Sequence, residues 1–325
     1  MPADTVLVTG ATGFVGAALV PALLGAGHPV RATTRTLRPG LPAGVEWREA
    51  DLARPAALPA LLEGVRAAFF LVHGMSDGRE DYAREERRLA GAFAAEAARA
   101  GLERIVYLGG VAPRGAPSRH LASRLEVGEV LRAGRVPALE LRASMIVGAR
   151  SASWRVVRDL ALRLPAMVLP AWARSRTCPI AIDDVVGALV AALRVPASGG
   201  AVYDVPGPEV LAVAQVLERV AALRGRSLPY LRAPLPAPRV SSLWLKLVSD
   251  ADWDVVRELV QGLESDLLPE DDRYWALAGL PPRLGFDEAA RRALADDPPP
   301  AGLRGAVLAV EEALVDLFPL RRKGR

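Results

Sequence analysis

The amino-acid sequence predicts an α/β protein built on a doubly wound parallel sheet, and three observations support this fold class. Short apolar runs suited to buried strands alternate with segments of helical periodicity through the first 150 residues. The first run, residues 5–8, leads into three glycines that stand three residues apart, Gly10, Gly13 and Gly16. The chain has 325 residues with 51% apolar side chains, which is enough for an extensive core. We therefore expect a Rossmann-type sheet followed by a smaller, mostly helical region.

The alternation gives the order of the predicted elements. Strands are expected near residues 5–8, 29–34, 45–50, 66–72, 104–109 and 138–142. Helices are expected near residues 14–26, 55–63, 80–100 and 119–133. Gly25 and Gly27 predict the end of the first helix, although Pro21 within it conflicts with the helical pattern. Pro113 and Pro117 predict a loop after the fifth strand.

The character of the chain changes after residue 150. We expect a dinucleotide-binding domain over 1–150, whose sheet is completed by about residues 178–205, and a smaller substrate-side and helical region over 151–325. A stretch that contains Trp154 and Trp172 is expected to lie over the carboxyl ends of the strands. Ligands of open α/β sheets bind there, so this stretch is expected to cover a substrate.

The three glycines fall on the turn between the first strand and the first helix. In such a turn Gly10 allows a tight reversal, Gly13 allows the backbone to approach a pyrophosphate, and Gly16 allows the helix to lie close to the strand. The N-terminus of the following helix offers unpaired N–H groups to an anion. An ordinary glycine-rich loop is the alternative, but the strand before the turn and the helix after it favour a nucleotide-binding turn.

The stretch Thr-Gly-Ala-Thr-Gly-Phe-Val-Gly at 9–16 has one residue more between its first two glycines than the turn of ordinary dinucleotide dehydrogenases. It resembles the opening of the short-chain dehydrogenase/reductase superfamily, in particular its extended and atypical branches, which include NmrA-like regulators and an accessory subunit of respiratory complex I. Similar segments stand at 50–52, 70–75, 104–110, 140–144 and 179–185. The resemblance covers about residues 4–205 and implies an NAD(P)-binding protein.

The resemblance implies a set of cofactor-binding residues. In the glycine turn these are Gly10, Thr12, Gly13, Phe14, Val15 and Gly16. After the third and fourth strands they are Asp51, Leu52, Leu71, Val72 and His73. Asp51 corresponds to an adenine-contacting acid, and the residues that end the fourth strand are expected on the ribose side of the cofactor. The alternative role of Asp51 is that of a helix N-terminal cap.

The end of the second strand favours NADP(H) over NAD(H). No acid stands there to bind a ribose 2′-hydroxyl, and Arg35 follows the strand directly, with Arg31 and Arg38 nearby. A guanidinium can form a bidentate, charge-assisted contact with a 2′-phosphate. The alternative is that these are three more surface arginines of an arginine-rich chain. We expect NADPH as the cofactor, with NAD less favoured.

The residues that catalyse hydride transfer in standard members of the superfamily are absent. Such members use a tyrosine, a lysine four residues later and a serine after the fifth strand, whereas this chain has no Tyr-x-x-x-Lys and has Gly109 and Gly110 where the serine is expected. At the position of the dyad it carries His120 and Arg124. An imidazole exchanges protons near neutral pH and a guanidinium stabilises an oxyanion, so these two residues are the catalytic candidates. A solvent-exposed neighbour of a helix cap is the alternative role of His120.

Several polar residues farther along the chain have two interpretations. Arg142 and Asp184 resemble recurring family positions that are either structural or substrate-binding. Arg174, Arg176 and Thr177 precede the strand that returns to the sheet, where an acidic substrate is one interpretation and a solvated basic loop, which we favour, is the other.

Two classes of function remain open. The first is an NADPH-dependent oxidoreductase of the atypical short-chain dehydrogenase type that acts on an unknown small carbonyl, alkene or quinone. The second is a non-catalytic NAD(P)H-binding regulatory or complex-accessory protein, which the joint loss of tyrosine, lysine and serine favours. The polar groups expected at the strand ends tip the balance slightly toward the enzyme.

The composition argues against several other classes. Cys178 is the only cysteine and the three histidines lie far apart in the sequence, so neither an internal disulfide nor a metal site is expected. The net charge of +4 comes from scattered residues rather than a basic run, so no nucleic-acid partner is expected. No apolar run reaches the ~18 residues of a membrane span, and no secretory signal precedes the first strand. We therefore expect a cytoplasmic protein.

The C-terminal part carries patterns of its own. Proline-rich residues 229–238 predict a linker, and apolar residues recur every three or four positions from Leu303 to Leu317, before a basic cluster at 321–325. This periodicity predicts an amphipathic helix. Its apolar stripe can dock on its own domain, which we favour, on a second subunit in a homo-oligomer, or on an anionic membrane surface.

Overall fold

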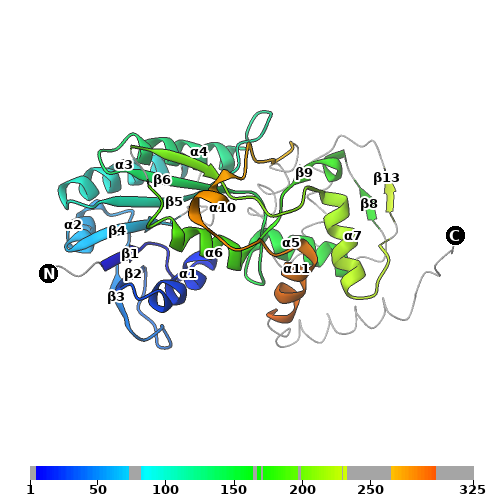
Figure 1. Cartoon of the computed structure of the whole chain (residues 1–325), viewed down its shortest axis with the longest axis horizontal. Helices are drawn as coiled ribbons and strands as arrows, with labels where there is room; N and C mark the ends of the chain where they lie inside the picture. Colours follow the sequence, from blue (N-terminus) through cyan, green and yellow to red (C-terminus); the bar gives the residue numbers. More distant parts are fainter. Residues whose placement is uncertain are drawn as a thin grey trace.

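The structure is a computed structural model that describes residues 5–72, 82–163, 167–169, 171–196, 199–228, 230–232 and 265–297. It has two lobes that lie side by side (Figure 1). One lobe holds a parallel sheet between two layers of helices, and the other is mainly helical. Within the described ranges no helix combines the length and the apolar character that crossing a membrane requires.

Seven parallel strands form the main sheet. From one edge to the other they are β11 (Ala201–Asp204), β6 (Ala138–Ala143), β5 (Arg104–Gly110), β4 (Val65–Phe70), β1 (Thr5–Val8), β2 (Val30–Thr34) and β3 (Val45–Glu49). The strand order reverses at β1, which pairs with β2 on one side and with β4 on the other. A crevice for ligands is expected at such a reversal, outside the carboxyl ends of the strands.

In the part of the chain that the structure describes, five helices cover the two faces of this sheet. They are α1 (Phe14–Gly25), α2 (Leu58–Leu62), α3 (Tyr82–Arg99), α4 (Arg119–Arg132) and α6 (Ile182–Ala191). Helices α1 and α6 pack together on one face, and α3 and α4 pack together on the other (Figure 1). Successive residues of a strand point to opposite faces, so Val8 is buried in the core beneath α1 and α6, whereas Leu7 is buried in the core beneath α2, α3 and α4.

The second lobe has a separate core beneath three helices. They are α5 (Ala152–Arg163), α7 (Val213–Leu223) and α11 (Phe286–Ala295). Trp154 of α5 and Phe286 of α11 are almost completely buried there, among the aliphatic side chains of α5 and α7. The cavity described below extends into this lobe.

Three pairs of short strands lie outside the main sheet. β7 (Ile146–Val147) pairs with β10 (Ile180–Ala181), β9 (Arg176–Thr177) with β12 (Leu211–Ala212), and β8 (Met167–Leu169) with β13 (Tyr230–Arg232). Of these strands only the one before α6 was predicted. Strands of two or three residues are too short to show an alternating pattern.

The predicted fold class is confirmed, and each predicted strand and helix up to residue 143 is present within a few residues of its expected ends. Pro21 lies inside α1 in spite of the conflict that it presents. The predicted linker was wrong at residues 230–232, which form β13 by pairing with β8. Residues 229 and 233–238 of that linker, and the predicted helix at 303–317, lie outside the described residues.

Candidate functional site

The glycine turn has the geometry of a nucleotide-binding turn. Gly10 has a φ of +65°, and a Cβ atom there would lie 2.6 Å from the carbonyl oxygen of Leu71, just after β4. A Cβ atom on Gly16 would collide with the backbone of Gly10 and Ala11. On Gly13 a Cβ atom would meet only the oxygen of Gly10, at 3.1 Å. Protein packing therefore requires glycine at the first and third positions, whereas Gly13 leaves room for a ligand.

The N-terminus of α1 is suited to an anion. Gly13 is its N-cap, no side chain caps this terminus, and no acidic residue stands in the first turn. Uncapped N–H groups and the positive end of the helix dipole stabilise a negative charge. A cofactor diphosphate therefore fits the chemistry of the turn, in the space left open beside Gly13.

A cavity of about 410 Å³ opens at the carboxyl ends of β1, β4 and β5. It includes the glycine turn and the start of α4, and it extends between α5 and α7 in the second lobe. The predicted site residues that line it are Gly10, Gly13, Phe14, Val15, Gly16, Leu71, His120 and Arg124. The structure thus brings the predicted cofactor turn and the predicted catalytic pair into one space.

Arg124 lies beside the carboxyl end of β5. Its Nη2 atom donates to the carbonyl oxygen of Leu108 at 2.6 Å, and the hydroxyl of Tyr107 donates to the carbonyl oxygen of Arg124 at 3.0 Å. The Nε atom is buried and makes no hydrogen bond to any part of the chain that the structure describes. The guanidinium is therefore held in place at one end while a further donor remains unused.

His120 stands near the start of α4, one turn before Arg124, and lines the same cavity. Ser118 caps this helix by accepting from the backbone nitrogen of Leu121 at 3.3 Å. Burial, and then the positive charge of Arg124, lower the pKa of His120 from 6.5 to about 3. The imidazole is therefore neutral at pH 7, which argues against a role as a general acid but leaves it able to form a hydrogen bond with a ligand.

The part of the cavity between α5 and α7 is apolar. We call it the apolar arm, and its walls are Val156, Val157, Leu160, Val213, Val216 and Leu217. Trp172 and Thr177 also line the cavity, and both are more than nine-tenths buried. Desolvation favours an apolar chain in such a space, so the arm suits a ligand with a hydrocarbon part.

Of the three arginines predicted near a 2′-phosphate, Arg31 has another role. Its Nη1 atom donates to the carbonyl oxygens of Leu61 at 2.9 Å and Glu63 at 2.7 Å, and its Nε atom lies 3.0 Å from a carboxylate oxygen of Glu46. These contacts fasten β2 to α2 and β3. Arg35 is exposed directly after β2, which leaves it available to a ligand.

Asp51 makes a capping contact, which was the alternative to its predicted role as an adenine-contacting acid. Its Oδ1 atom accepts from the backbone nitrogen of Ala53 at 3.1 Å, and its Oδ2 atom lies 3.7 Å from Nε of Arg54. The turn that it stabilises leads into the 3-10 helix η1 (Pro55–Ala57). Leu52, the neighbouring predicted residue, is buried in the core beneath α2 and α3.

The remaining predicted cofactor residues are not among those that line the cavity. Val72 is half-buried and packs against the same core as Leu52. The carbonyl oxygen of Thr12 accepts a hydrogen bond from Arg150 at 3.3 Å. His73 lies outside the described residues.

A buried carboxylate lies beneath the end of β5. Glu140 is 1% exposed and forms ion pairs with Arg132 and Arg142, the latter at 2.8 Å. Two glycines make room for it, because a Cβ atom on Gly109 would lie 2.6 Å from its Oε1 atom and one on Gly128 would collide with the carboxylate. Glu140 therefore joins β5, β6 and α4, and Arg142 has a structural partner.

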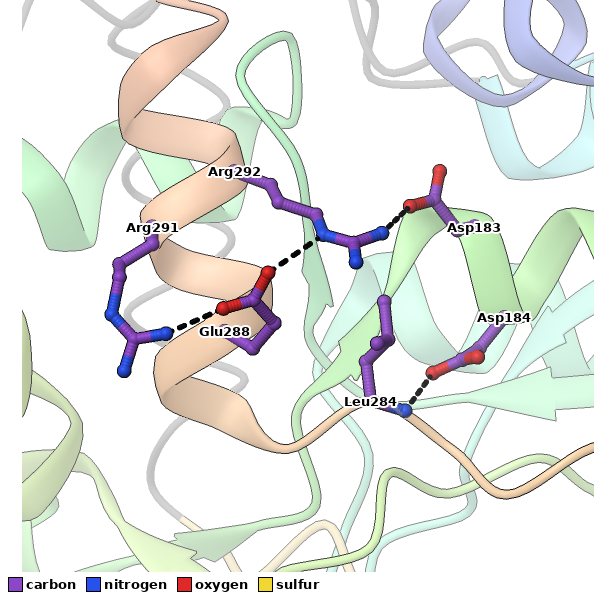
Figure 2. A network of polar contacts seen from close by, with 6 residues as sticks. All are labelled: Asp183, Asp184, Leu284, Glu288, Arg291 and Arg292. Atoms are coloured by element: carbon purple, nitrogen blue, oxygen red, sulfur yellow. Dashed lines mark hydrogen bonds and ion pairs between the residues drawn. The ribbon is translucent and has the colours of Figure 1, made fainter.

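Asp184 contacts the backbone of a later segment. Its Oδ2 atom accepts from the nitrogen of Leu284 at 2.9 Å (Figure 2). Asp183 accepts from Arg292 at 3.1 Å, and Arg292 also donates to Glu288 at 3.0 Å. These contacts join α6 to α11, so the structural interpretation of Asp184 accounts for its position.

The basic loop at 174–177 does not form a single binding unit. Arg176 pairs with Asp266 at 2.7 Å at the surface, and Arg174 is exposed. Only Thr177 lines the cavity.

Several polar residues of the cavity were not predicted from the sequence. Ser118 caps α4, Ser144 donates to the carbonyl oxygen of Cys178 at 2.8 Å, and Arg150 contacts the glycine turn. An N-cap signal marks Ser118, since a serine precedes the helical pattern. No spacing marks Ser144 or Arg150, which reach the cavity through tertiary structure.

Comparisons with known proteins agree with this geometry. Residues 2–144 match the model of the NmrA-like family. MoeE5 in complex with UDP-glucuronic acid and NAD has a similar fold, with a TM-score of 0.68 and 19% identity over 90% of this chain and 98% of that one. UDP-glucuronic acid 4-epimerase from Bacillus cereus gives a TM-score of 0.67 at 15% identity, over 90% of this chain and 98% of its own.

Residues 2–144 are therefore similar to the NmrA-like family, and the chain shares the fold of these solved structures. This confirms the resemblance seen in the glycine turn and the later motifs. A curated relative, the ceramide reductase of Caulobacter vibrioides (strain NA1000 / CB15N), is 34% identical over 205 residues. The match covers 60% of this chain and 62% of the relative, so less than two thirds of the relative is represented here.

The protein has no room for a serine at Gly110 unless a neighbour moves. A Cβ atom on Gly110 would lie 2.6 Å from Cδ1 of Leu121, which is buried on the first turn of α4. The side chain of Leu121 thus takes the space beside β5 where a standard member carries a hydroxyl. The polar group nearest to this space is the guanidinium of Arg124, whose Nε atom would lie 3.8 Å from the same Cβ atom.

Proposed function

We propose that the protein is an NAD(P)H-dependent reductase that acts on a carbonyl compound with an apolar chain. One observation carries the proposal: the open side of the glycine turn, Arg124 and the apolar arm all line the same cavity. A dinucleotide at the turn and a hydrocarbon chain in the arm therefore share one space with a fixed positive charge. This deepens the expectation of a small carbonyl substrate by adding a chain.

The relatives support both parts of this proposal. The curated relative is named a ceramide reductase, and ceramides are lipids, whose chains suit an apolar arm. The solved structures of MoeE5 and of the epimerase from Bacillus cereus contain NAD. A nicotinamide dinucleotide is therefore the cofactor class that we assign.

NADPH is our preferred cofactor because of the loop after β2. Arg35 is exposed there, and no carboxylate in the described part of the chain pairs with it. Glu49, which lies beside Thr34 in the sheet, uses its Oε2 atom to accept from the backbone nitrogen of Leu37 at 3.0 Å. This acid is thus engaged by the loop, which leaves Arg35 to meet a 2′-phosphate. NAD is the alternative that the bound neighbours support.

In this mechanism the bound cofactor would supply a hydride to the carbonyl carbon. Arg124 would stabilise the negative charge that develops on the carbonyl oxygen, since its guanidinium is already positioned by the bond to Leu108. His120 would orient the substrate as a neutral hydrogen-bonding group, because its pKa of about 3 leaves it without an acidic proton at pH 7. The proton that neutralises the alkoxide would come from solvent.

Non-catalytic binding of NAD(P)H is the second candidate function. It is supported by the glycine at position 110 and by the depressed pKa of His120, which leave no strong proton donor among the residues discussed above. In that case the apolar arm would hold a regulatory ligand instead of a substrate.

Steady-state NADPH oxidation distinguishes the two functions. The assay compares a long-chain β-keto amide with a short water-soluble ketone, using wild type, Arg124→Gln and Arg135→Gln. Arg135 is a matched control because it is exposed in the loop after α4 and does not line the cavity. We expect turnover of the long-chain compound by wild type and by Arg135→Gln, and a kcat lower by about 10²–10³ in Arg124→Gln. Tight NADPH binding without turnover of any carbonyl compound would favour the second function.

A further inference from the structure

The loop that follows β7 lies against the glycine turn. A Cβ atom on Gly148 would lie 2.9 Å from Cζ of Phe14 and 3.1 Å from Cγ2 of Ile182, so only glycine allows this loop to approach the start of α1 so closely. Two residues later, Nη2 of Arg150 donates to the carbonyl oxygen of Thr12 at 3.3 Å. The guanidinium of Arg150 is thus positioned at the glycine turn by a loop far away in sequence, and it lines the same cavity.

Arg150, like Arg35 and Arg124, has no carboxylate counter-ion among the described residues, but it alone of the three contacts the glycine turn. Arg31, Arg142 and Arg176 each pair with a carboxylate. Arg150 is exposed at the cavity, and its bond to Thr12 is long and involves a neutral oxygen. Within the described residues no carboxylate pairs with it. Arg150 is thus a cation beside an anion-binding turn, and it has no carboxylate partner there. A phosphate of a bound ligand would supply the missing negative charge.

The second observation is the charge of the turn itself. The N-terminus of α1 has no capping side chain and no acid in its first turn, so its positive dipole end is also without a protein partner. Gly13 has space on its ligand side, as described above. Two positive features from different parts of the chain therefore face the same place, with no negative group of the described protein between them.

We propose that Arg150 binds the diphosphate of the cofactor, and clamps it against the N-terminus of α1. The guanidinium would exchange its bond to the oxygen of Thr12 for a charge-assisted contact with a phosphate oxygen. Arg150 would then act on NADH and NADPH alike, whereas Arg35 would act on the 2′-phosphate alone. This inference rests on the proposed cofactor, and it adds a residue that the glycine motif does not contain.

Calorimetric titration of the full chain tests the assignment without turnover. NADPH, NADH and ADP-ribose are titrated into wild type, Arg150→Gln, Arg35→Ala and the control Arg135→Gln. Loss of a charge-assisted hydrogen bond at a partly exposed site predicts about tenfold weaker binding of all three ligands to Arg150→Gln. Arg35→Ala should weaken only NADPH, and Arg135→Gln should weaken none. Arg150→Lys should recover part of the affinity, because it keeps the charge but loses the planar fork.

Unchanged dinucleotide affinity in Arg150→Gln would overturn the inference. A loss of affinity confined to NADPH would also overturn it, because Arg150 would then bind the 2′-phosphate. A raised KM for the carbonyl substrate with unchanged cofactor binding would overturn it as well, because Arg150 would then bind the substrate. If wild type binds neither dinucleotide, the proposed cofactor itself is wrong, and the role of Arg150 falls with it. Circular dichroism melting curves of each variant show whether a loss of affinity reflects a loss of folding.

Discussion

Replacing Arg124 with glutamine separates catalysis from stability at one residue. The guanidinium is expected to stabilise the oxyanion of the reduced carbonyl, and it also donates to the carbonyl oxygen of Leu108 at 2.6 Å. Removal of one preorganised donor of this kind lowers kcat by about 10²–10³. The shorter amide does not carry the charge, so we expect Arg124→Gln to lose activity in that range while KM for NADPH changes little.

The same substitution also has a structural cost. The carbonyl oxygen of Leu108 would lose its partner, and an unpaired buried acceptor costs about 1–3 kcal/mol. For a protein of 325 residues that corresponds to a fall in Tm of roughly 1–5 °C. The reduced kcat should therefore be measured well below the new Tm, where the variant is folded.

Chemical rescue provides the decisive assay. Free guanidinium at low, non-denaturing concentration should restore part of the activity of Arg124→Gln but should leave Arg135→Gln unaffected, because only the first variant has an empty space for the cation beside the cavity. A kcat of Arg124→Gln within threefold of wild type would refute the reasoning, whatever the change in Tm. The kcat of Arg124→Lys should lie between that of wild type and that of Arg124→Gln, because lysine keeps the charge but lacks the planar fork of the guanidinium.

Three further outcomes follow from the buried groups. The pKa of His120 is about 3 in the folded protein and ordinarily 6.5, so between these values only the unfolded state binds a proton at this residue. The stability of the protein should therefore fall as the pH drops below about 6.5. In melting curves measured at several pH values, His120→Gln should reduce that fall. Glu140→Gln should lower the unfolding free energy by about 3 kcal/mol in urea titration, because Arg132 and Arg142 lose the charge that they share; a loss below about 1 kcal/mol would mean that solvent reaches the cluster. Gly128→Ala, which favours an isolated helix by about 1 kcal/mol, should instead destabilise the protein, and the sign should reverse in a Glu140→Ala background.

The order of the main sheet could be predicted because its signals are local. Most residues of β1, β2, β4, β5 and β6 are buried, and β3 alternates the half-buried Val45 and Trp47 with exposed residues. The helices α1, α3 and α4 are long enough to show a helical period. The glycine turn could also be predicted, because the spacing of its glycines is a local pattern. The steric demand on Gly16 comes from Gly10 and Ala11, whereas that on Gly10 comes from Leu71, which only the fold brings close. The short strands pair as β7–β10, β8–β13 and β9–β12, each with a partner far away in sequence. No local pattern therefore predicts them.

The candidate site was predicted less completely for the same physical reason. The sequence placed Arg31 near a phosphate, but its actual partners, Leu61 and Glu63, come from a helix that packs beside β2 only in three dimensions. The low pKa of His120 results mainly from burial, which cannot be predicted from the sequence around this residue. Arg150 approaches Thr12 across 138 positions of chain, a distance at which only the fold determines contact.

The return of the chain to the first lobe at residues 270–278 limits how the protein can be divided into modules. Tyr274 of α10 (Arg273–Ala278) is fully buried in the core beneath α1 and α6, stacks against Tyr203 of β11 with ring centroids 5.4 Å apart, and donates to the carbonyl oxygen of Ala188 at 2.8 Å. The backbone of Glu270 is likewise held by Asp204 at 2.6 Å. The core of the first lobe is therefore completed by α10, which follows α5 and α7 of the second lobe and precedes α11 of that lobe. A gene fragment cut where the sequence changes character would lack β11 and encode an unfinished sheet. Because α6, β11 and α10 of the first lobe stand between α5, α7 and α11 of the second, recombination cannot exchange the second lobe as one continuous segment.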